Sequence, residues 1–267
     1  MAKLTGKTAL VTGSVQGIGF AIAQAIASAG ARVALHGLPD DPKAEEAVNA
    51  MLEAGAADAR YFAADMSDPA KIDELMAEVA EWGGADILVN NAGIQHPAAI
   101  ADVPRDTWNA IIAVNLSACF HTMQAAMPEM EKRGYGRVIN IASVQGLIGS
   151  IHKAPYVSAK HGLVGLSKVA ALEYARAGSK SKGGVTVNCI CPGWTETELI
   201  GPQIDARAQQ IGGDRDAAIA DLLSEKQPTC RTSDPSEMGA LALWLCDPVA
   251  HNVTGTQIPV DGGWTAQ

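Results

Sequence analysis

The fold is decided by residues 7–37, which read KTALVTGSVQGIGFAIAQAIASAGARVALHG. Residues 7–12 form a short apolar and β-branched run, and glycines follow at positions 13, 17 and 19. From Phe20 to Gly30 apolar residues recur at helical spacing, and a second apolar run occupies residues 31–37. This order predicts a strand, a glycine-rich loop, a helix and a second strand, which open a doubly wound sheet.

The same alternation continues along the rest of the chain. We expect further strands at 57–64, 86–90, 136–142, 185–191 and 256–260. We expect helices at 42–55, 69–82, 104–133, 155–178 and 235–246, and one or two helices within 205–227. Alternating strands and helices predict parallel strands and right-handed crossovers. The sequence therefore predicts one α/β domain over residues 1–267, a Rossmann-type doubly wound parallel sheet of seven strands with helices on both faces.

Composition restricts the class of partner. The chain has 267 residues, of which 48% are apolar, so it can form a packed core without metals or disulfides. Its formal net charge is −9 and its Lys and Arg residues do not cluster, which argues against a nucleic acid or an anionic membrane as partner. No apolar run reaches the roughly 20 residues of a membrane span. We expect a cytoplasmic protein with five reduced cysteines and no metal site.

The glycine-rich loop from Thr12 to Gly19 indicates a nucleotide cofactor. Glycines let the backbone turn tightly and approach a pyrophosphate, whose charge is stabilised by the N-terminus of the following helix. The spacing Gly-x-x-x-Gly-x-Gly differs from the standard dinucleotide fingerprint. At this point a tight strand–helix turn without a ligand is the alternative.

The end of the second strand bears on the choice between NAD and NADP. An acidic residue there binds the ribose hydroxyls, whereas an arginine binds the 2′-phosphate. Residues 35–41 read LHGLPDD and contain no Lys or Arg, and neither does the loop at 14–16. Asp40 and Asp41 would repel a phosphate, so NAD is favoured. His36 either contacts the adenosine ribose or lies exposed at the end of the strand.

A second informative stretch runs from Ser143 to Lys160. Ser143 follows the predicted strand at 136–142, and Tyr156 precedes Lys160 by four residues. In a helix that begins near Pro155, Tyr156 and Lys160 lie one turn apart on the same face. A lysine ammonium stabilises a nearby phenolate, which suits a general acid/base that interconverts an alcohol and a ketone. Taken alone, the pair also fits an ordinary amphipathic helix.

Six features, in this order along the chain, resemble the short-chain dehydrogenase/reductase family over essentially its whole length. They are Thr12-Gly13-x-x-x-Gly17-x-Gly19, Asn90-Asn91-Ala92-Gly93, Asn115, Ser143, Tyr156-x-x-x-Lys160 and Pro192-Gly193. The resemblance implies hydride transfer between a substrate carbon and a nicotinamide. It implies that Tyr156 is the general acid/base and that Lys160 stabilises it and binds the nicotinamide ribose. Ser143 would hold the substrate oxygen, and Asn115 would hold a water in a proton relay to Lys160.

The resemblance also implies a set of cofactor contacts. The pyrophosphate would lie on the glycine loop, the adenosine along residues 91–93, and the adenine amino group against Asp65. Residues 192–197 would grip the nicotinamide carboxamide. The implied cofactor residues are Gly13, Ser14, Gln16, Gly17, Ile18, Gly19, Asp65, Met66, Asn91, Ala92, Gly93, Tyr156, Lys160, Pro192, Gly193, Thr195 and Thr197.

Residues 90–96, 190–194, 222–228 and 260–265 resemble one branch of the family, the bacterial D-3-hydroxybutyrate dehydrogenases. The implied substrate contacts are Gln95, Ser143, Gln145, Lys153, Tyr156, Trp194 and Gln203. Lys153 supplies a positive charge for a small carboxylate substrate, and the amides supply directional donors. The branch's carboxylate-binding histidine is Gln145 here, so Lys153 carries the charge alone unless His152 or His96 contributes. A slightly larger hydroxy acid, or a keto acid reduced in the opposite direction, stays open as the substrate.

Two other functions and two structural expectations complete this interpretation. A 3-oxoacyl-carrier-protein reductase would require NADPH and a basic patch, and a non-catalytic binding protein would not need the intact catalytic set. Residues 198–228 are expected to form a lid that excludes water from the substrate. The family is commonly tetrameric, so we expect a homotetramer with subunit contacts on the helices at 104–133 and 155–178.

Overall fold

A seven-stranded parallel sheet lies at the centre of the computed structural model, which describes residues 3–179, 181, 183–197, 200–224 and 226–266. The strand order is β3-β2-β1-β4-β5-β6-β7, and every neighbouring pair is parallel. The strands are β1 (Thr8–Val11), β2 (Arg32–Gly37), β3 (Asp58–Ala63), β4 (Ile87–Asn90), β5 (Tyr135–Ile141), β6 (Gly184–Pro192) and β7 (Gln257–Val260). The predicted doubly wound α/β fold is therefore confirmed.

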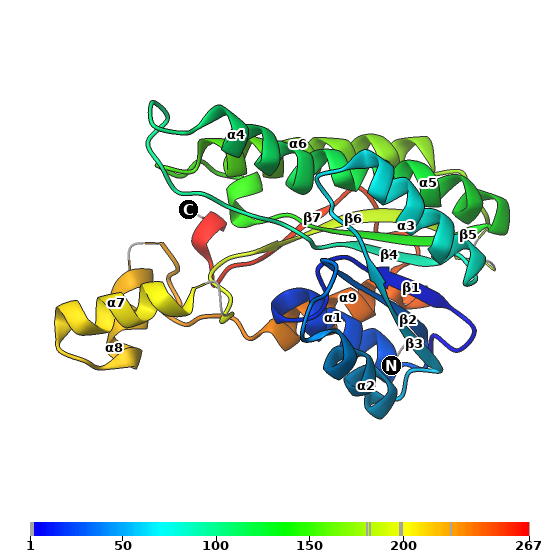
Figure 1. The fold of residues 1–267 in the computed structure, drawn as a ribbon, viewed down its shortest axis with the longest axis horizontal. Coiled ribbons are helices and arrows are strands. Elements are labelled where there is room, and N and C mark those ends of the chain that lie inside the picture. The colour runs from blue at the N-terminus through cyan, green and yellow to red at the C-terminus, as the bar shows by residue number, and fades with distance from the viewer. Residues whose placement is uncertain (1–2, 180, 182, 198–199, 225, 267) are drawn as a thin grey trace.

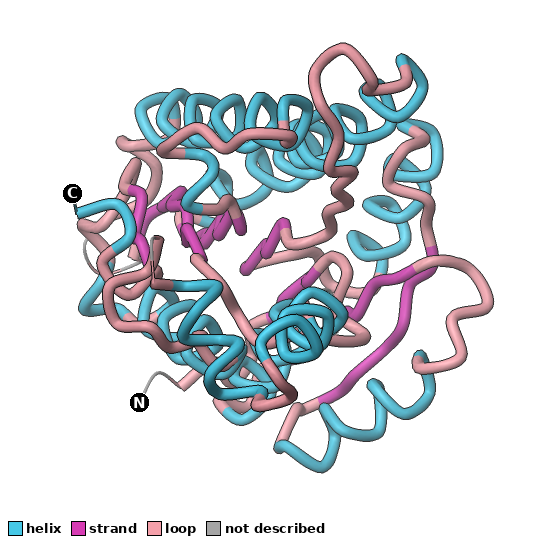
Figure 2. Tube along the Cα trace, turned by 90° about the vertical axis from the view of Figure 1, so that its left-hand side faces the viewer, coloured by secondary structure: helices cyan, strands magenta, loops and turns pink. Residues whose placement is uncertain are grey.

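Helices cover both faces of the sheet, as Figures 1 and 2 show. One face carries α1 (Gly17–Ser28), α2 (Ala44–Ala54) and α9 (Pro235–Cys246). The other carries α3 (Pro69–Glu81), α4 (Arg105–Ile112), α5 (Ala118–Arg133) and α6 (Ala154–Glu173). Helices α7 (Gly201–Ile211) and α8 (Arg215–Leu223) form a hairpin that stands away from both layers in Figure 1.

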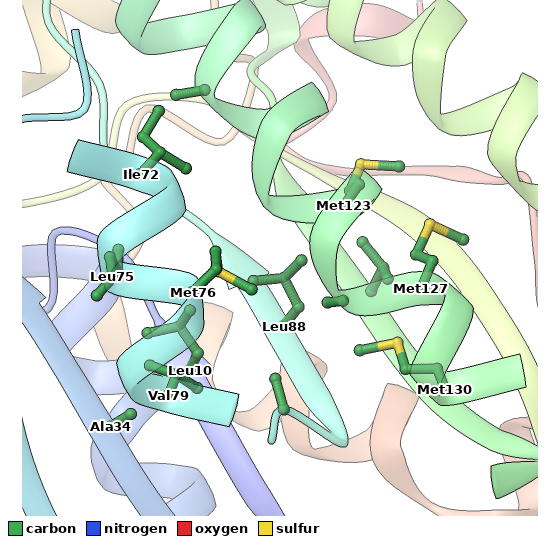
Figure 3. Close-up of a cluster of buried hydrophobic side chains, with 14 of the residues drawn as sticks. Leu10, Ala34, Ile72, Leu75, Met76, Val79, Leu88, Met123, Met127 and Met130 are labelled. Atoms are coloured by element: carbon green, nitrogen blue, oxygen red, sulfur yellow. The ribbon is translucent and has the colours of Figure 1, made fainter. Parts of the chain in front are cut away.

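Side-chain alternation along the strands builds a core on each side of the sheet. Ala9 and Val11 of β1 pack in the layer of α1 and α9, whereas Leu10 between them packs against the α3 and α5 layer. Figure 3 shows the second layer, where Leu10 and Leu88 from the strands lie among helix side chains. Because both faces are covered, the strands read as continuous apolar runs in the sequence.

Three helices differ from their expected form. The expected helix over 104–133 contains a π-helical turn, η1 (Ala113–Ser117), between α4 and α5, and such turns often mark functional sites. Helix α6 ends at Glu173, before the expected end at Gly178, which has φ +74° and lies tightly against the backbone of Gly134. The 205–227 region contains two helices, and the first begins earlier, at Gly201.

The helical stretch Arg105–Arg133 contains an 18-residue window with a mean hydropathy of 1.3, which by length and composition alone is apolar enough to cross a membrane. In this fold its second half lies on the sheet, and Met123, Met127 and Met130 are buried there (Figure 3). The core helix of a globular protein meets the same criterion.

The crevice for a ligand lies at the carboxyl ends of β1 and β4. These two strands are neighbours, but the chain runs from β1 outward to β3 and only then returns to β4 on the other side. Such a reversal separates the loops that follow the two strands and leaves a crevice between them. The glycine loop and residues 91–93 follow these two strands.

Candidate active site

The glycine loop is fastened to the loop that follows β4. Asn91 Nδ2 donates to the carbonyl oxygens of Thr12 (2.9 Å) and Gly13 (2.8 Å). The Thr12 hydroxyl accepts from the backbone N–H groups of Asn91 and Ala92 at 2.9 and 3.0 Å. Gly13 has φ +61°, and a Cβ at Gly19 would overlap the carbonyl oxygen of Gly13. The glycines therefore permit a backbone path that side chains would block.

His36 is neither exposed nor directed at a ribose, which corrects both alternatives drawn from the sequence. Its ring is buried, Nδ1 accepts from the Gly13 N–H at 3.0 Å, and Nε2 contacts the Ala64 carbonyl at 3.2 Å. Burial lowers the pKa of His36 to about 4, although the Ala64 bond opposes that shift. A neutral ring with its proton on Nε2 satisfies both contacts, so His36 joins the glycine loop to the ends of β2 and β3.

The loop after β2 brings one acidic and one basic side chain to the edge of the crevice where the cofactor is expected. The Asp41 carboxylate lies beside Gly37, and it also accepts from the Lys43 N–H at 2.9 Å. The Lys43 ammonium donates to Gln16 Oε1 at 2.7 Å. The sequence interpretation considered residues 35–41 and 14–16 and missed this lysine, because a side chain from the first residues beyond the strand reaches back to the loop.

The predicted adenosine side lies along the same edge. Ser14 is buried, and its hydroxyl accepts from the His36 N–H at 2.9 Å, so its oxygen already has a structural partner. Asp65 is exposed after β3, and its carboxylate accepts from the Ser67 N–H at 2.8 Å, a bond that lowers its pKa. Met66 beside it is buried, whereas Gly93 is exposed next to Asn115.

Tyr156 and Lys160 lie in the first turns of α6, and Lys160 reaches the end of β5, two residues before Ser143. Ser143 lies two residues beyond the end of β5, is buried, and its hydroxyl oxygen accepts from the Gln145 N–H at 3.1 Å. The Lys160 ammonium lies 5.6 Å from the centroid of the Tyr156 ring and donates to the Ile141 carbonyl at 2.6 Å. Within the described part of the chain, the Tyr156 hydroxyl has no hydrogen-bond partner. It is therefore available to a substrate.

Asn115 lies in the π-helical turn and is fully buried. Its Oδ1 accepts from the Ile94 N–H at 2.9 Å, and its Nδ2 donates to the Ile94 carbonyl at 2.8 Å. The side chain thus fixes the loop after β4 beside the catalytic group. The relay role expected for Asn115 stays a prediction.

The residues after β6 close the other end of the crevice. Thr195 is buried, and its hydroxyl oxygen has no partner within the described structure. The Thr197 methyl group lies 3.5 Å from the position that a Cβ on Gly17 would take, so this segment reaches the glycine loop. Pro192 is the last residue of β6, and Gly193 N–H donates to the Val260 carbonyl at 2.9 Å.

These residues fit a dinucleotide. Helix α1 begins at Gly17, and Gln16 before it makes no side-chain cap, so the first-turn N–H groups face the loop as an anion site. Gly13 and Gly17 both have positive φ, which favours glycine. The backbone of the loop can therefore approach a pyrophosphate without a side chain between them. At the opposite end, the unpaired Thr195 hydroxyl is a group that a carboxamide would satisfy.

The substrate side is formed by two loops that contact one another. Ala98 N–H donates to the His152 carbonyl at 2.8 Å, which joins the loop carrying Gln95 to the loop carrying Lys153. Gln95, Lys153 and Trp194 are half-buried, and Gln145 is buried with its Oε1 unpaired. The side chain of Gln203 lies outside the described residues.

The α7–α8 hairpin has its own small core and a fixed stem. Ile204, Ala208 and Ala218 are buried between its two helices. Arg215 pairs with Asp205 at 2.9 Å within the hairpin and with Glu196 at 3.0 Å outside it. The expected lid at 198–228 therefore corresponds to a compact hairpin, although residues 198, 199 and 225 are not among those described.

The return from the hairpin is held by a residue that the sequence interpretation missed. Gln227 is buried, its Oε1 accepts from the Trp194 N–H at 3.2 Å, and its Nε2 donates to the Arg231 carbonyl. A Cβ at Gly193 would collide with this Gln227 amide. Gln227 thus ties the end of the hairpin to the end of β6.

Comparison with known proteins shows the family of this chain. The short chain dehydrogenase family matches residues 7–208. D-beta-hydroxybutyrate dehydrogenase of Cupriavidus necator is 48% identical over 266 residues, which is 99% of this chain and 100% of that protein. The enzyme of the same name from Rhizobium meliloti is 46% identical, covering 98% of this chain and 99% of its own length.

A solved structure shows the same fold with a cofactor. It is a 3-oxoacyl (acyl-carrier-protein) reductase from Agrobacterium tumefaciens with NADP bound. It superimposes with a TM-score of 0.86 at 31% identity and covers 98% of this chain and 95% of its own. The chain described here belongs to the short-chain dehydrogenase family and is an oxidoreductase that uses a nicotinamide cofactor.

Proposed function

We propose that this enzyme interconverts D-3-hydroxybutyrate, or a closely related short hydroxy acid, with the corresponding keto acid, acetoacetate, using NAD. The observation that carries the proposal is the half-buried Lys153, placed one turn before the Tyr156 phenol on α6. A carboxylate on this ammonium would bring a nearby hydroxyl within reach of Tyr156 and Ser143. The two D-beta-hydroxybutyrate dehydrogenases, each similar over nearly the whole chain, add support.

The catalytic side chains divide the work in this proposal. The Ser143 hydroxyl holds the substrate oxygen, and during oxidation the phenolate of Tyr156 takes the hydroxyl proton and becomes the phenol. The Lys160 ammonium stabilises the Tyr156 phenolate that accepts this proton, and its remaining N–H groups can bind the ribose. The nicotinamide supplies the hydride acceptor. The α7–α8 hairpin closes over the substrate and excludes water.

We infer NAD rather than NADP from the charge at the end of β2. The Asp41 carboxylate beside Gly37 occupies the region where an acidic residue binds ribose hydroxyls. Lys43 at Gln16 is the basic group that favours the opposite preference. Measuring kcat/KM for both cofactors decides between them, and Lys43→Gln should weaken NADP much more than NAD. A wild-type preference for NADP would contradict the inference.

The direct test mixes the purified enzyme with NAD and D-3-hydroxybutyrate and follows absorbance of the reduced cofactor. Turnover of the D acid, with little turnover of the L acid, is the expected result. Turnover only of longer or branched hydroxy acids would remove hydroxybutyrate as the substrate. A 3-oxoacyl-carrier-protein reductase is the second candidate, favoured by the NADP-bound relative. Strong NADPH-dependent reduction of a 3-oxoacyl thioester would establish that candidate instead.

We also propose a cytoplasmic homotetramer. Apolar side chains are exposed on and beside the two helices expected to make subunit contacts, including Ile100 and Ile151 before them and Phe120, Val169 and Leu172 within them. A second copy packed on these helices would bury a surface that a monomer leaves in water. Light scattering should give four times the chain mass, and Leu172→Lys should lower it.

A further inference from the structure

The segment that follows β6 is paired with the return leg of the α7–α8 hairpin, residues 227–233. The Ser233 N–H donates to the Trp194 carbonyl at 2.8 Å, and the Glu196 N–H donates to the Ser233 carbonyl at 2.8 Å. Thr195 and Ser233 thus form an isolated parallel bridge. The return leg therefore supports the two residues that flank Thr195.

Gln227 adds a side-chain bond to this main-chain pairing. Its side chain is buried, Oε1 accepts from the Trp194 N–H at 3.2 Å, and Nε2 donates to the Arg231 carbonyl. Both polar ends of the amide are therefore bonded. Together with Ser233, Gln227 holds the N–H and the carbonyl of Trp194, which directly precedes Thr195.

Glycines lie on two sides of the Gln227 amide. A Cβ at Gly193 would lie 2.8 Å from Oε1, and a Cβ at Gly262 would lie 3.0 Å from Nε2. Both distances are well inside ordinary van der Waals contact. The amide thus fills a space that two glycines leave open, and packing as well as hydrogen bonding fixes its position.

The Thr195 hydroxyl is the polar group that this arrangement leaves unpaired. Thr195 is buried, and its Oγ1 has no partner within the described residues. A buried polar group of this kind is stabilised when a ligand or a water bonds to it. Thr197, two residues further along, reaches Gly17 of the glycine loop, which places the segment at the cofactor crevice.

We propose that Gln227 is a positioning residue for the nicotinamide end of the cofactor. By holding Trp194 it fixes the backbone next to Thr195, and so sets where the Thr195 hydroxyl stands for the carboxamide of the nicotinamide. Gln227 acts through Thr195 and not by contacting the cofactor. The inference goes beyond the proposed function, because it holds for any substrate that exchanges a hydride with the nicotinamide.

The test compares the binding of NADH with the binding of ADP-ribose, which shares the adenosine, pyrophosphate and second ribose but lacks the nicotinamide. Gln227→Met keeps the length of the side chain and removes both amide groups. It should weaken NADH binding roughly five- to tenfold and leave ADP-ribose binding within about twofold. Titration of NADH fluorescence and calorimetry with ADP-ribose measure the two affinities. Should the enzyme prefer NADP, NADPH and 2′-phospho-ADP-ribose give the same comparison.

Two further variants and a control separate positioning from general stability. Gln227→Glu keeps an oxygen for the Trp194 N–H and should restore most of the NADH affinity. Gln227→Asn withdraws the amide from Trp194 but stays polar, so it carries the test if Gln227→Met does not fold. Gln257→Met removes a glutamine bond to the Gly255 carbonyl at the start of β7 and should match the wild type. Equal weakening of NADH and ADP-ribose, or unchanged NADH binding, would overturn the inference.

A double-mutant cycle tests whether Gln227 acts through Thr195. Thr195→Val removes the hydroxyl and keeps the shape of the side chain. In the Thr195→Val background, Gln227→Met should weaken NADH binding by less than about twofold, since the positioned group is already gone. Losses that multiply independently would overturn the inference. The binding test needs no hydroxy acid, so failure to turn over hydroxybutyrate would contradict the proposed function alone.

Discussion

The cofactor side and the substrate side share one edge of the sheet but are held in different ways. On the cofactor side, Thr12, His36 and Asn91 bond directly to the glycine loop or its neighbours at 2.8–3.0 Å. On the substrate side, the Gln145 Oε1 is buried and unpaired, and partial burial lowers the pKa of the half-buried Lys153. The fold satisfies the polar groups of the glycine loop itself, whereas the substrate side is left with a buried polar group that a ligand must satisfy.

This difference separates cofactor binding, which every substrate requires, from the selection of one substrate. A loop whose bonds are already made offers a preorganised anion site with little cost of ordering when the cofactor binds. Unpaired polar groups on the substrate side favour the binding of a ligand that forms hydrogen bonds with them and disfavour the binding of one that leaves them unpaired. Substitutions on the cofactor side should therefore affect folding stability and the activity toward every substrate alike. Substitutions on the substrate side should affect the activity toward particular substrates.

The largest effect is expected at the boundary between the two sides. Tyr156→Phe removes the acid/base hydroxyl and should lower kcat roughly 10²–10⁴-fold, with binding of the nicotinamide cofactor retained. Stopped-flow or steady-state rates measure the loss, and quenching of protein fluorescence measures cofactor affinity. Tyr174→Phe, just beyond the end of the same helix, serves as the control and should be fully active. Near wild-type turnover by Tyr156→Phe would remove tyrosine from the mechanism.

The next largest effect tests the cofactor side through the pH dependence of the free energy of unfolding. The folded pKa of His36 is about 4 and its unfolded value is 6.5, so between these values the unfolded state binds the extra proton. Lowering the pH from 6.5 to 4 should therefore remove on the order of 3 kcal/mol of folding free energy, and raising it above 6.5 should change nothing through this residue. Urea unfolding across this range measures the slope.

A replacement identifies His36 as the source. His36→Asn keeps an acceptor for the Gly13 N–H and cannot take up a proton, so most of the acid-dependent slope should disappear. His161→Asn, at an exposed histidine on α6, should keep the slope. An unchanged slope in His36→Asn would show that other groups cause the acid sensitivity.

The sequence predicts the fold well because the strands are apolar on both faces and the helices follow a clear period. All seven strands lie where the apolar runs place them, and the Ser143, Tyr156 and Lys160 cluster forms from spacing within one α/β unit. The role of His36 was open to prediction in part: a histidine inside an otherwise apolar run is a candidate for a buried neutral ring.

The residues that sequence reasoning missed depend on contacts across loops. Lys43 reaches Gln16 over 27 positions, and Gln227 reaches Trp194 over 33. No local period marks such pairs, because loop geometry and not secondary structure brings them together. Similarly, the helix from 104 looks regular in sequence, and only the fold reveals the π-helical turn that holds Asn115 against Ile94.

A smaller effect is expected on the substrate side, at Lys153. Lys153→Ala removes the half-buried ammonium and should raise KM for hydroxybutyrate roughly ten- to a hundredfold, with less change in kcat. The same variant should reduce an uncharged ketone about as well as the wild type, which identifies the loss as one of charge recognition. Lys168→Ala, at an exposed lysine further along α6, is the matched control. An unchanged KM in Lys153→Ala would place the anion site elsewhere.

The smallest effect, and the sharpest for specificity, is expected at Gln145. Gln145→His introduces a side chain that can carry charge, and it should improve kcat/KM for hydroxybutyrate severalfold, corresponding to about 1 kcal/mol. Because an ordinary histidine is protonated mainly below about pH 6.5, the gain should be larger at pH 6 than at pH 8. An equal gain at both pH values would point to shape rather than charge. A loss with hydroxybutyrate but not with a larger hydroxy acid would show that the buried amide is matched to a different substrate, so the unpaired Gln145 oxygen would then mark where that substrate donates a hydrogen bond.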